Sequence, residues 1–207
     1  RDVMEVDTPV MSHCAVSDPF IDSISVNYQP TLEAEITSLY LQTSPEYAMK
    51  RLLAAGSGSI YQLGKVFRNG EYGRRHNPEF TMLEWYRPGF TDCDLMDEVE
   101  ALVTSVLDIG TIERVTYSDL FQRYLSFRPE EVDIDQLITE ARQHIDIDLD
   151  DRNPDTWLNL LMSHLIEPAL VEEGAVFVTE YPASQAALAQ VRTNQKGIAI
   201  AARFELF

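Results

Sequence analysis

Apolar residues recur at two spacings along the chain and predict a mixture of strands and helices. Two-residue alternation or short apolar runs predict strands over residues 3–10, 24–26, 39–42, 60–67, 80–86 and 175–179. Apolar residues three and four apart predict helices over residues 95–107, 118–125, 134–145 and 154–170. A further helix is predicted to begin at Ser44-Pro45-Glu46, which supplies a capping serine, a first-turn proline and an acidic residue near the positive end of the helix dipole. It is predicted to end at Gly56 or Gly58.

The order of these segments predicts an α+β fold with a mostly antiparallel sheet. Strands 60–67 and 80–86 are joined by a glycine-rich, charged link over residues 69–77, which is typical of a long-looped hairpin. The helical segments between about 111 and 172 fall between two groups of strands, so we interpret them as a helical insertion. A length of 207 residues fits one domain, or one domain with an inserted subdomain.

The charge of the chain restricts its partners. Asp and Glu number 34 against 16 Lys and Arg, and the net charge of −18 weighs against general nucleic-acid binding. Residues 65–87 depart from this, with five positive and three negative side chains and a local charge of +2. Either this is a solvated basic hairpin, or it is a pocket for a polyanion such as a nucleotide.

Other sequence features favour a soluble cytoplasmic protein. No apolar run approaches the roughly 18 residues of a membrane span, and we expect neither a signal peptide nor a membrane partner. Two cysteines indicate neither a disulfide framework nor a zinc site, and the four histidines have no metal-binding spacing. No P-loop, dinucleotide fingerprint or catalytic nucleophile can be recognised.

Strand 80–86 places a carboxylate and a phenol beside two apolar side chains. Because side chains alternate between the faces of a strand, the first face carries Phe80, Met82, Glu84 and Tyr86. The second set, on the other face, is Thr81, Leu83 and Trp85. We interpret the second set as an ordinary core face. A buried carboxylate needs a partner, so Glu84 is a candidate for binding a cationic amine, supported by Tyr86. The alternatives are a solvent-exposed face or an internal salt bridge.

Arg68 lies where the predicted hairpin opens. The guanidinium group presents a rigid fork of donors that suits a phosphate, although a surface ion pair is the commonest fate of a single arginine. Phe80, on the opposite strand, is a candidate for stacking on a nucleotide base or for the core.

These residues carry a resemblance to a known family. Phe67-Arg68-Asn69 followed by residues 76–86 (HNPEFTMLEWY) resembles motif 2 of class II lysyl-tRNA synthetases and their relatives, and residues 4–9 (MEVDTP) resemble the strand half of motif 1. Residues 43–53 (TSPEYAMKRLL) and 181–190 (YPASQAALAQ) are similar to the branch of elongation factor P (R)-β-lysine ligases. True lysyl-tRNA synthetases usually carry Ala-Pro-Glu in place of Ser44-Pro45-Glu46. The resemblance covers essentially the whole chain.

The resemblance implies a class II aminoacyl-tRNA synthetase-like antiparallel sheet flanked by helices, with a helical insertion. It implies an ATP-dependent, AMP-forming aminoacyl ligase that uses Mg²⁺, activates (R)-β-lysine as an adenylate and transfers it to a lysine of elongation factor P. The partners implied are elongation factor P, lysine or β-lysine, and a second subunit in a full-length homodimer, but not tRNA. The alternatives are a catalytic fragment of a lysyl-tRNA synthetase and a non-catalytic paralogue with a binding or regulatory role.

The resemblance also implies roles for individual residues. Arg68 is the expected catalytic residue and is expected to hold the α-phosphate of ATP. The expected ATP site comprises Arg68, Gly70, Glu71, Asn77 and Phe80. The expected amino-acid site comprises Ser44, Pro45, Glu46, Glu84 and Tyr86. The family motif usually continues Arg-Asn-Glu, whereas position 70 is glycine here, which makes Glu71 the candidate replacement. We expect residues 1–207 to be a partial catalytic domain, truncated at both ends and inactive alone, with metal ligands outside it.

Overall fold

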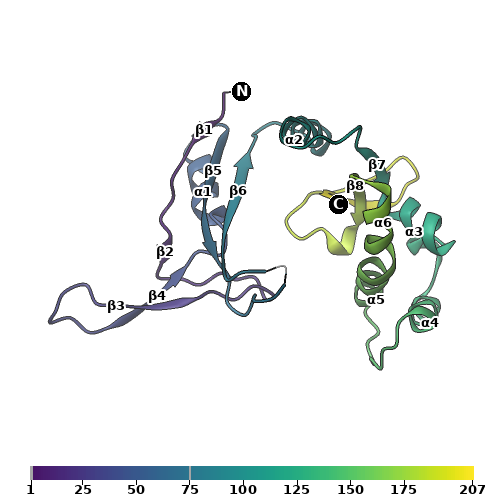
Figure 1. Cartoon of the computed structure of the whole chain (residues 1–207), viewed down its shortest axis with the longest axis horizontal. Coiled ribbons are helices and arrows are strands. Elements are labelled where there is room, and N and C mark those ends of the chain that lie inside the picture. Colours follow the sequence, from purple (N-terminus) through teal and green to yellow (C-terminus); the bar gives the residue numbers. More distant parts are fainter. Residues whose placement is uncertain (1, 75) are drawn as a thin grey trace. The chain divides into compact units, whose positions relative to one another are not determined.

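The computed structural model describes residues 2–74 and 76–207, and these form two compact units, the first ending at Gly89 and the second spanning Phe90–Phe207. Each unit combines strands with helices (Figure 1). All but two of the strand pairings are antiparallel among the described residues. The predicted α+β class with an antiparallel-rich sheet is therefore confirmed.

The main sheet of the first unit contains the predicted hairpin. Its order is β1 (Met4–Glu5), β5 (Ile60–Phe67) and β6 (Glu79–Tyr86). β5 and β6 pair antiparallel over their full lengths, and β1 pairs parallel with the start of β5. The prediction of a strand over residues 3–10 was wrong in extent. The last backbone hydrogen bond to β5 comes from the Val6 N–H, and the N–H of Thr8 donates instead to Oε1 of the buried Gln62 at 2.9 Å.

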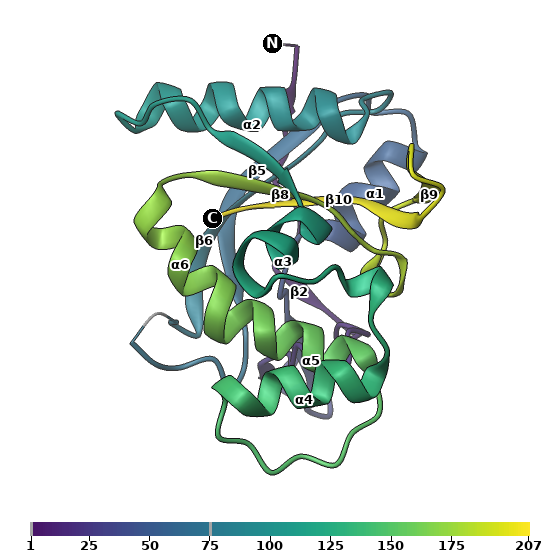
Figure 2. The same cartoon turned by 90° about the vertical axis from the view of Figure 1, so that its right-hand side faces the viewer.

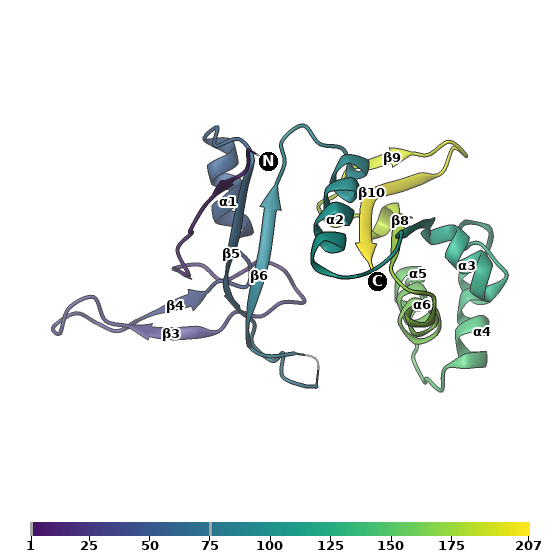
Figure 3. The same cartoon turned by 45° about the horizontal axis from the view of Figure 1, so that its top comes forward.

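A second small sheet of the first unit has the order β2 (Met11–Ser12), β4 (Thr37–Leu41) and β3 (Ser25–Tyr28). It confirms the strands predicted near residues 24–26 and 39–42. In Figure 3, β3 and β4 extend away from the β5–β6 hairpin. The end of β4 leads through residues 42–45 into the next helix, and this connection carries two residues of the candidate site.

Helix α1 (Glu46–Ala54) lies where its sequence predicts, but the cap residue is Pro45, so the prediction of Ser44 at the cap and Pro45 in the first turn was wrong by one position. The Ser44 hydroxyl accepts a hydrogen bond of 3.0 Å from the backbone N–H of Glu46, which satisfies one of the free donors of the first turn. At the other end, Gly56 has a φ of +89°, and the Ser57 N–H donates to the Leu52 carbonyl. This left-handed glycine ends the helix in the way that a Schellman turn requires.

The prediction that Thr81, Leu83 and Trp85 form an ordinary core face was wrong for the first two. Thr81 is exposed and Leu83 is 40% exposed. The opposite face of the hairpin is the enclosed one, because Glu84 pairs across the sheet with Gln62, which is 3% exposed. The connection before α1 lies against this face, since Ser44 reaches Glu84.

The second unit has a four-stranded sheet in the order β7 (Glu113–Thr116), β8 (Val176–Pro182), β10 (Ala199–Leu206) and β9 (Val191–Thr193). β8 confirms the strand predicted at residues 175–179, whereas β7, β9 and β10 were not predicted. β7 runs parallel to β8, and the other pairs are antiparallel.

Helices of the second unit cover this sheet and form most of its core (Figure 2). They are α2 (Asp92–Val106), α3 (Tyr117–Leu125), α4 (Ile134–His144), α5 (Pro154–Leu161) and α6 (Glu167–Glu173). Helices α3 to α6 fall between β7 and β8, in the interval interpreted as a helical insertion. Short 3₁₀ turns lie at Pro129–Glu131 and Ala183–Gln185.

The helix predicted over residues 154–170 is divided by a π-helical turn at Met162–Ile166. Glu167 donates its N–H to the Met162 carbonyl, five residues earlier. Pro168 follows directly and has no N–H to continue the ordinary pattern, which explains why the irregularity falls here. The flanking segments still pack as one element, because Trp157, Leu161 and Ile166 are all fully buried.

Candidate active site

A carboxylate held by two hydroxyl groups lies at the centre of the candidate amino-acid site. Ser44 Oγ donates to Glu84 Oε2 at 2.7 Å, and Tyr86 Oη donates to Glu84 Oε1 at 2.7 Å. Tyr86 comes from the same face of β6, two residues on, whereas Ser44 comes from the connection between β4 and α1. Both carboxylate oxygens are thus oriented by neutral donors, and the negative charge remains available to a cation.

The protonation of Tyr86 suits it to this role. Burial raises the pKa of Tyr86 far above its ordinary value, and the hydrogen bond to Glu84 raises this pKa further. The negative charges of Glu84 and Glu46 act in the same direction. The phenol therefore stays protonated and acts as a donor throughout the neutral pH range.

Glu46 adds a second carboxylate near this position. It lies in the first turn of α1, and its Oε1 is 2.5 Å from Nζ of Lys50, one turn further along the helix. Its negative charge is one of the causes of the raised pKa of Tyr86. Pro45 separates Glu46 from Ser44 and occupies the cap position of the helix. The expected substrate-site residues are therefore brought together by the start of α1 and the end of β6.

The hairpin opening holds Arg68 in a defined position. Its Nε donates to the Thr43 carbonyl at 3.3 Å, and its Cζ lies 5.2 Å from the centre of the Phe80 ring. Arg68 Nη1 is 3.8 Å from Glu71 Oε1. The Arg68 side chain is 23% exposed and therefore keeps access to a ligand, while the Thr43 carbonyl, the Phe80 ring and Glu71 lie around its guanidinium group.

The loop after Arg68 turns through Gly70, whose φ is +75°. This left-handed turn directs Glu71 back toward Arg68. A glutamate therefore lies beside the arginine even though position 70, where the family motif has glutamate, is glycine. Asn77 is exposed, and its side chain makes no hydrogen bond with the described part of the chain. Arg75, part of the predicted basic hairpin, lies outside the described residues.

Three contributors to the site were not predicted from the sequence. Thr43 holds Arg68 through a backbone carbonyl, which carries no side-chain signal. Asp22 accepts from Asn69 Nδ2 at 2.7 Å across a long sequence separation. Lys50 pairs with Glu46; only this last contact has a readable signal, the four-residue spacing on a helix.

The expected nucleotide-binding and amino-acid-binding residues are connected through two consecutive residues, Thr43 and Ser44. Thr43 contacts Arg68 of the nucleotide group, and Ser44 contacts Glu84 of the amino-acid group. The arrangement therefore offers an oriented carboxylate for an ammonium group and, next to it along the chain, a fixed guanidinium group for a phosphate.

Comparison of the sequence with known proteins shows the family to which the chain belongs. The model of the class II tRNA synthetases (D, K and N) matches residues 1–207. The chain belongs to this family. Among curated proteins, the chain is 47% identical to "Elongation factor P--(R)-beta-lysine ligase" of Vibrio cholerae and 46% identical to the protein of that name from Pseudoalteromonas translucida. The identity to the Haemophilus influenzae protein of the same name is 44%. Each comparison covers 100% of this chain and 64% of the relative's length.

Two further observations bear on partners. Across residues 2–74 and 76–207, no helix is long and apolar enough to cross a membrane. In the same described residues, no group of three or more His, Cys, Asp or Glu side chains is arranged to hold a metal ion.

Proposed function

We propose that the chain provides the substrate-binding hairpin of an ATP-dependent ligase that activates (R)-β-lysine and transfers it to elongation factor P. The observation that carries this proposal is the Glu84 carboxylate, oriented by the hydroxyl groups of Ser44 and Tyr86. The names of the relatives at 44–47% identity support the same substrate and acceptor.

Glu84 binds an ammonium group of the substrate in this proposal. Both Glu84 oxygens already accept neutral donors, and a carboxylate oxygen can accept a further hydrogen bond. A charge-assisted contact of this kind contributes about 1.5–3 kcal/mol. Glu46 is suited to attract the second ammonium group of a lysine-type substrate, which would replace Lys50 as its partner.

ATP is the second substrate and binds at the hairpin opening. Arg68 contacts the α-phosphate, and Gly70, Glu71, Asn77 and Phe80 complete the site for the nucleotide. The residues fit this ligand, because the Arg68 fork is fixed by the Thr43 carbonyl and an aromatic ring lies beside it. The described residues do not form a metal site, so we assign no residue of this chain to Mg²⁺.

The reaction has two steps. The β-lysine carboxylate attacks the α-phosphorus of ATP, the bond to the β-phosphate oxygen breaks, and pyrophosphate leaves. The ε-amino group of the acceptor lysine then attacks the acyl carbon, loses a proton and displaces AMP. Arg68 stabilises the negative charge that accumulates on the α-phosphate during the first step.

The distribution of charge favours a protein acceptor over tRNA. Residues 90–207 contain 23 Asp and Glu against 8 Lys and Arg, a net charge of −15. A tRNA backbone requires an extended basic surface, whereas a protein acceptor needs only access for one lysine side chain.

The decisive experiment supplies the full-length protein, of which residues 1–207 are expected to be a part, with ATP and labelled (R)-β-lysine or α-lysine, together with either elongation factor P or total tRNA. We expect label on elongation factor P, with faster pyrophosphate exchange for (R)-β-lysine than for α-lysine. Label on tRNA alone would instead support a lysyl-tRNA synthetase. Absence of pyrophosphate exchange with either amino acid would support a non-catalytic paralogue.

A further inference from the structure

Asn69 lies between Arg68 and Gly70, at the point where the chain leaves β5 and enters the loop of the hairpin. The Arg68 N–H donates to the Pro78 carbonyl, on the other side of the hairpin opening, at 2.9 Å. The Asn69 N–H donates instead to the carbonyl of Asp22, also at 2.9 Å. Asp22 belongs to the connection between β2 and β3, so a segment outside the hairpin anchors the loop directly before its left-handed turn.

The side chains of the same two residues form a second hydrogen bond. Asn69 Nδ2 donates to Asp22 Oδ2 at 2.7 Å, and the pair forms an isolated antiparallel bridge. One hydrogen bond would leave the loop free to pivot about it, whereas two bonds between the same residues also fix the orientation of the chain. The Asp22 side chain therefore sets the direction in which the chain enters the turn at Gly70.

This direction matters for Glu71 more than for Arg68. Glu71 Oε1 lies 3.8 Å from Arg68 Nη1, and Glu71 reaches this position only through the turn at Gly70, whose φ is +75°. Arg68 has a separate support, because its Nε donates to the Thr43 carbonyl. Loss of the Asp22 side chain should therefore displace the loop residues of the nucleotide site and leave the Arg68 fork in place.

The connection that carries Asp22 is itself held at two further points. The Val16 N–H donates to Oγ of Ser23, which is 8% exposed, at 3.2 Å. Ser17 Oγ and Tyr47 Oη are hydrogen-bonded at 2.5 Å, which ties the connection to the first turn of α1. Asp22 is therefore presented to Asn69 by a supported segment.

We propose that Asp22 is a positioning residue for nucleotide binding, and that its carboxylate acts through Asn69 on the loop that carries Gly70 and Glu71. This inference rests on the proposed function, which assigns ATP to the hairpin opening. The acceptor oxygen of Asp22 is the feature that matters, since a negative charge by itself repels the phosphates of a nucleotide. An asparagine at this position keeps an acceptor oxygen and removes the charge, so it separates the two properties.

The test measures pyrophosphate exchange by the full-length protein at varied concentrations of ATP and of (R)-β-lysine. Asp22→Ala should raise the KM for ATP about three- to tenfold, the effect of one hydrogen bond, and change the KM for β-lysine little. Asp22→Asn should restore the KM for ATP to the wild-type value or below. Asp18→Ala removes an exposed carboxylate of the same connection that accepts from the Phe20 N–H, and it should leave both KM values unchanged.

A double variant tests whether Asp22 acts through Asn69. Asn69→Ala removes the donor, so adding Asp22→Ala to it should raise the KM for ATP no further. Independent roles would instead give effects that multiply in the double variant, and this result would overturn the proposal.

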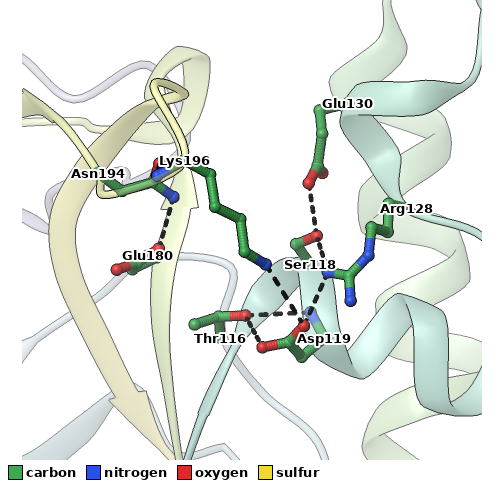
Figure 4. Close-up of polar contacts among 8 residues, drawn as sticks. All are labelled: Thr116, Ser118, Asp119, Arg128, Glu130, Glu180, Asn194 and Lys196. Carbon is green, nitrogen blue, oxygen red and sulfur yellow. Dashed lines mark hydrogen bonds and ion pairs between the residues drawn. The ribbon is translucent and has the colours of Figure 1, made fainter.

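A carboxylate of the second unit provides a control for stability. Asp119 accepts from Arg128 Nη1 at 2.7 Å and from the Thr116 hydroxyl at 2.8 Å, and Lys196 Nζ lies 4.0 Å from it (Figure 4). Asp119→Ala should lower the midpoint of denaturant unfolding without changing the ratio of the two KM values. An equal rise of both KM values in Asp22→Ala would show that Asp22 has only a structural role.

Trypsin cleavage after the exposed Arg74, measured by mass spectrometry without substrates, reports the loop anchor independently of activity. Asp22→Ala should be cleaved several-fold faster than the wild-type protein, and Asp22→Asn at the wild-type rate. An unchanged KM for ATP in folded Asp22→Ala, or an equal rise in Asp22→Asn, would overturn the proposal while leaving the proposed function intact. Absence of exchange in the wild-type protein would refute the proposed function, and the positioning role with it, even if the cleavage rates differ as expected.

Discussion

Ser44 Oγ lies 2.7 Å from Glu84 Oε2, and this hydrogen bond joins the start of a helix to the middle of a strand forty residues away. The same hydroxyl accepts from the Glu46 N–H at 3.0 Å. One serine therefore both starts α1 and orients the carboxylate of the candidate amino-acid site. Its replacement is expected to affect substrate binding as well as the local start of the helix.

Ser44→Ala should raise the KM for (R)-β-lysine roughly tenfold, because a hydrogen bond to a charged group contributes about 1.5–3 kcal/mol. The KM for ATP should change much less. Pyrophosphate-exchange kinetics of the full-length protein at varied concentrations of each substrate measure both values. Ser38→Ala, an exposed position on β4, is the control. An unchanged KM for β-lysine would contradict the role of this hydroxyl.

In the full-length enzyme, Arg68→Ala should slow pyrophosphate exchange about 100-fold or more, because a fixed donor at a developing charge contributes about 3 kcal/mol to the transition state. Arg68→Lys keeps the charge but loses the fork that contacts the Thr43 carbonyl, so it should restore only part of the rate. Arg51→Ala removes an exposed arginine of α1 and serves as the control. Near-normal exchange by a folded Arg68→Ala protein would exclude Arg68 from catalysis.

Gly70→Ala tests whether the loop conformation places Glu71. No atom lies within 4 Å of the added Cβ, so the cost arises from the φ of +75° alone and should be about 1 kcal/mol in the free energy of unfolding. The KM for ATP should rise, because Glu71 is carried by this turn, whereas the KM for β-lysine should not. Gly73→Ala has equal space and no positive φ and should change neither value. Equal effects of both variants would show that the turn at Gly70 is not required.

Tyr117→Phe tests the buried hydroxyl of the second unit. Burial raises the pKa of Tyr117, so the folded protein keeps this proton at pH values where the unfolded chain loses it. Its contribution to stability is therefore complete below about pH 10 and is lost as the pH rises above that value. The variant should lose less stability than the wild-type chain between pH 10 and 11.5.

Denaturant unfolding at several pH values measures this difference. At pH 7 the variant should lie within about 1 kcal/mol of the wild-type chain, because the hydroxyl has no hydrogen bond to lose. Tyr72→Phe, at a position that is 85% exposed, should leave the pH dependence unchanged. An identical alkaline decline in Tyr117→Phe would show that another group controls it.

Local patterns predicted the hairpin well because its signals lie within a few residues of one another. The alternation of 80–86 placed Glu84 and Tyr86 on one face, and they are hydrogen-bonded there. The same alternation could not decide which face is enclosed, because this depends on the connection containing Ser44, forty residues earlier. The open position of Leu83 follows from this long-range packing.

The second unit shows the complementary limit. β10 was not predicted, although Arg203 and Glu205 alternate with Phe204 and Leu206, because the alanines before them weaken the strand signal. The π-helical turn was not predicted either, since Pro168 indicates an irregularity without specifying its form.

The adjacency of Thr43 and Ser44 has a thermodynamic consequence for the proposed enzyme. A single peptide unit joins the carbonyl that holds Arg68 to the hydroxyl that holds Glu84. An amino acid that draws Glu84 and Ser44 into one arrangement also fixes the guanidinium group that meets the nucleotide. For the proposed enzyme we therefore expect the two substrates to bind with positive cooperativity, each increasing the affinity of the other by the same factor, since the coupling free energy is reciprocal.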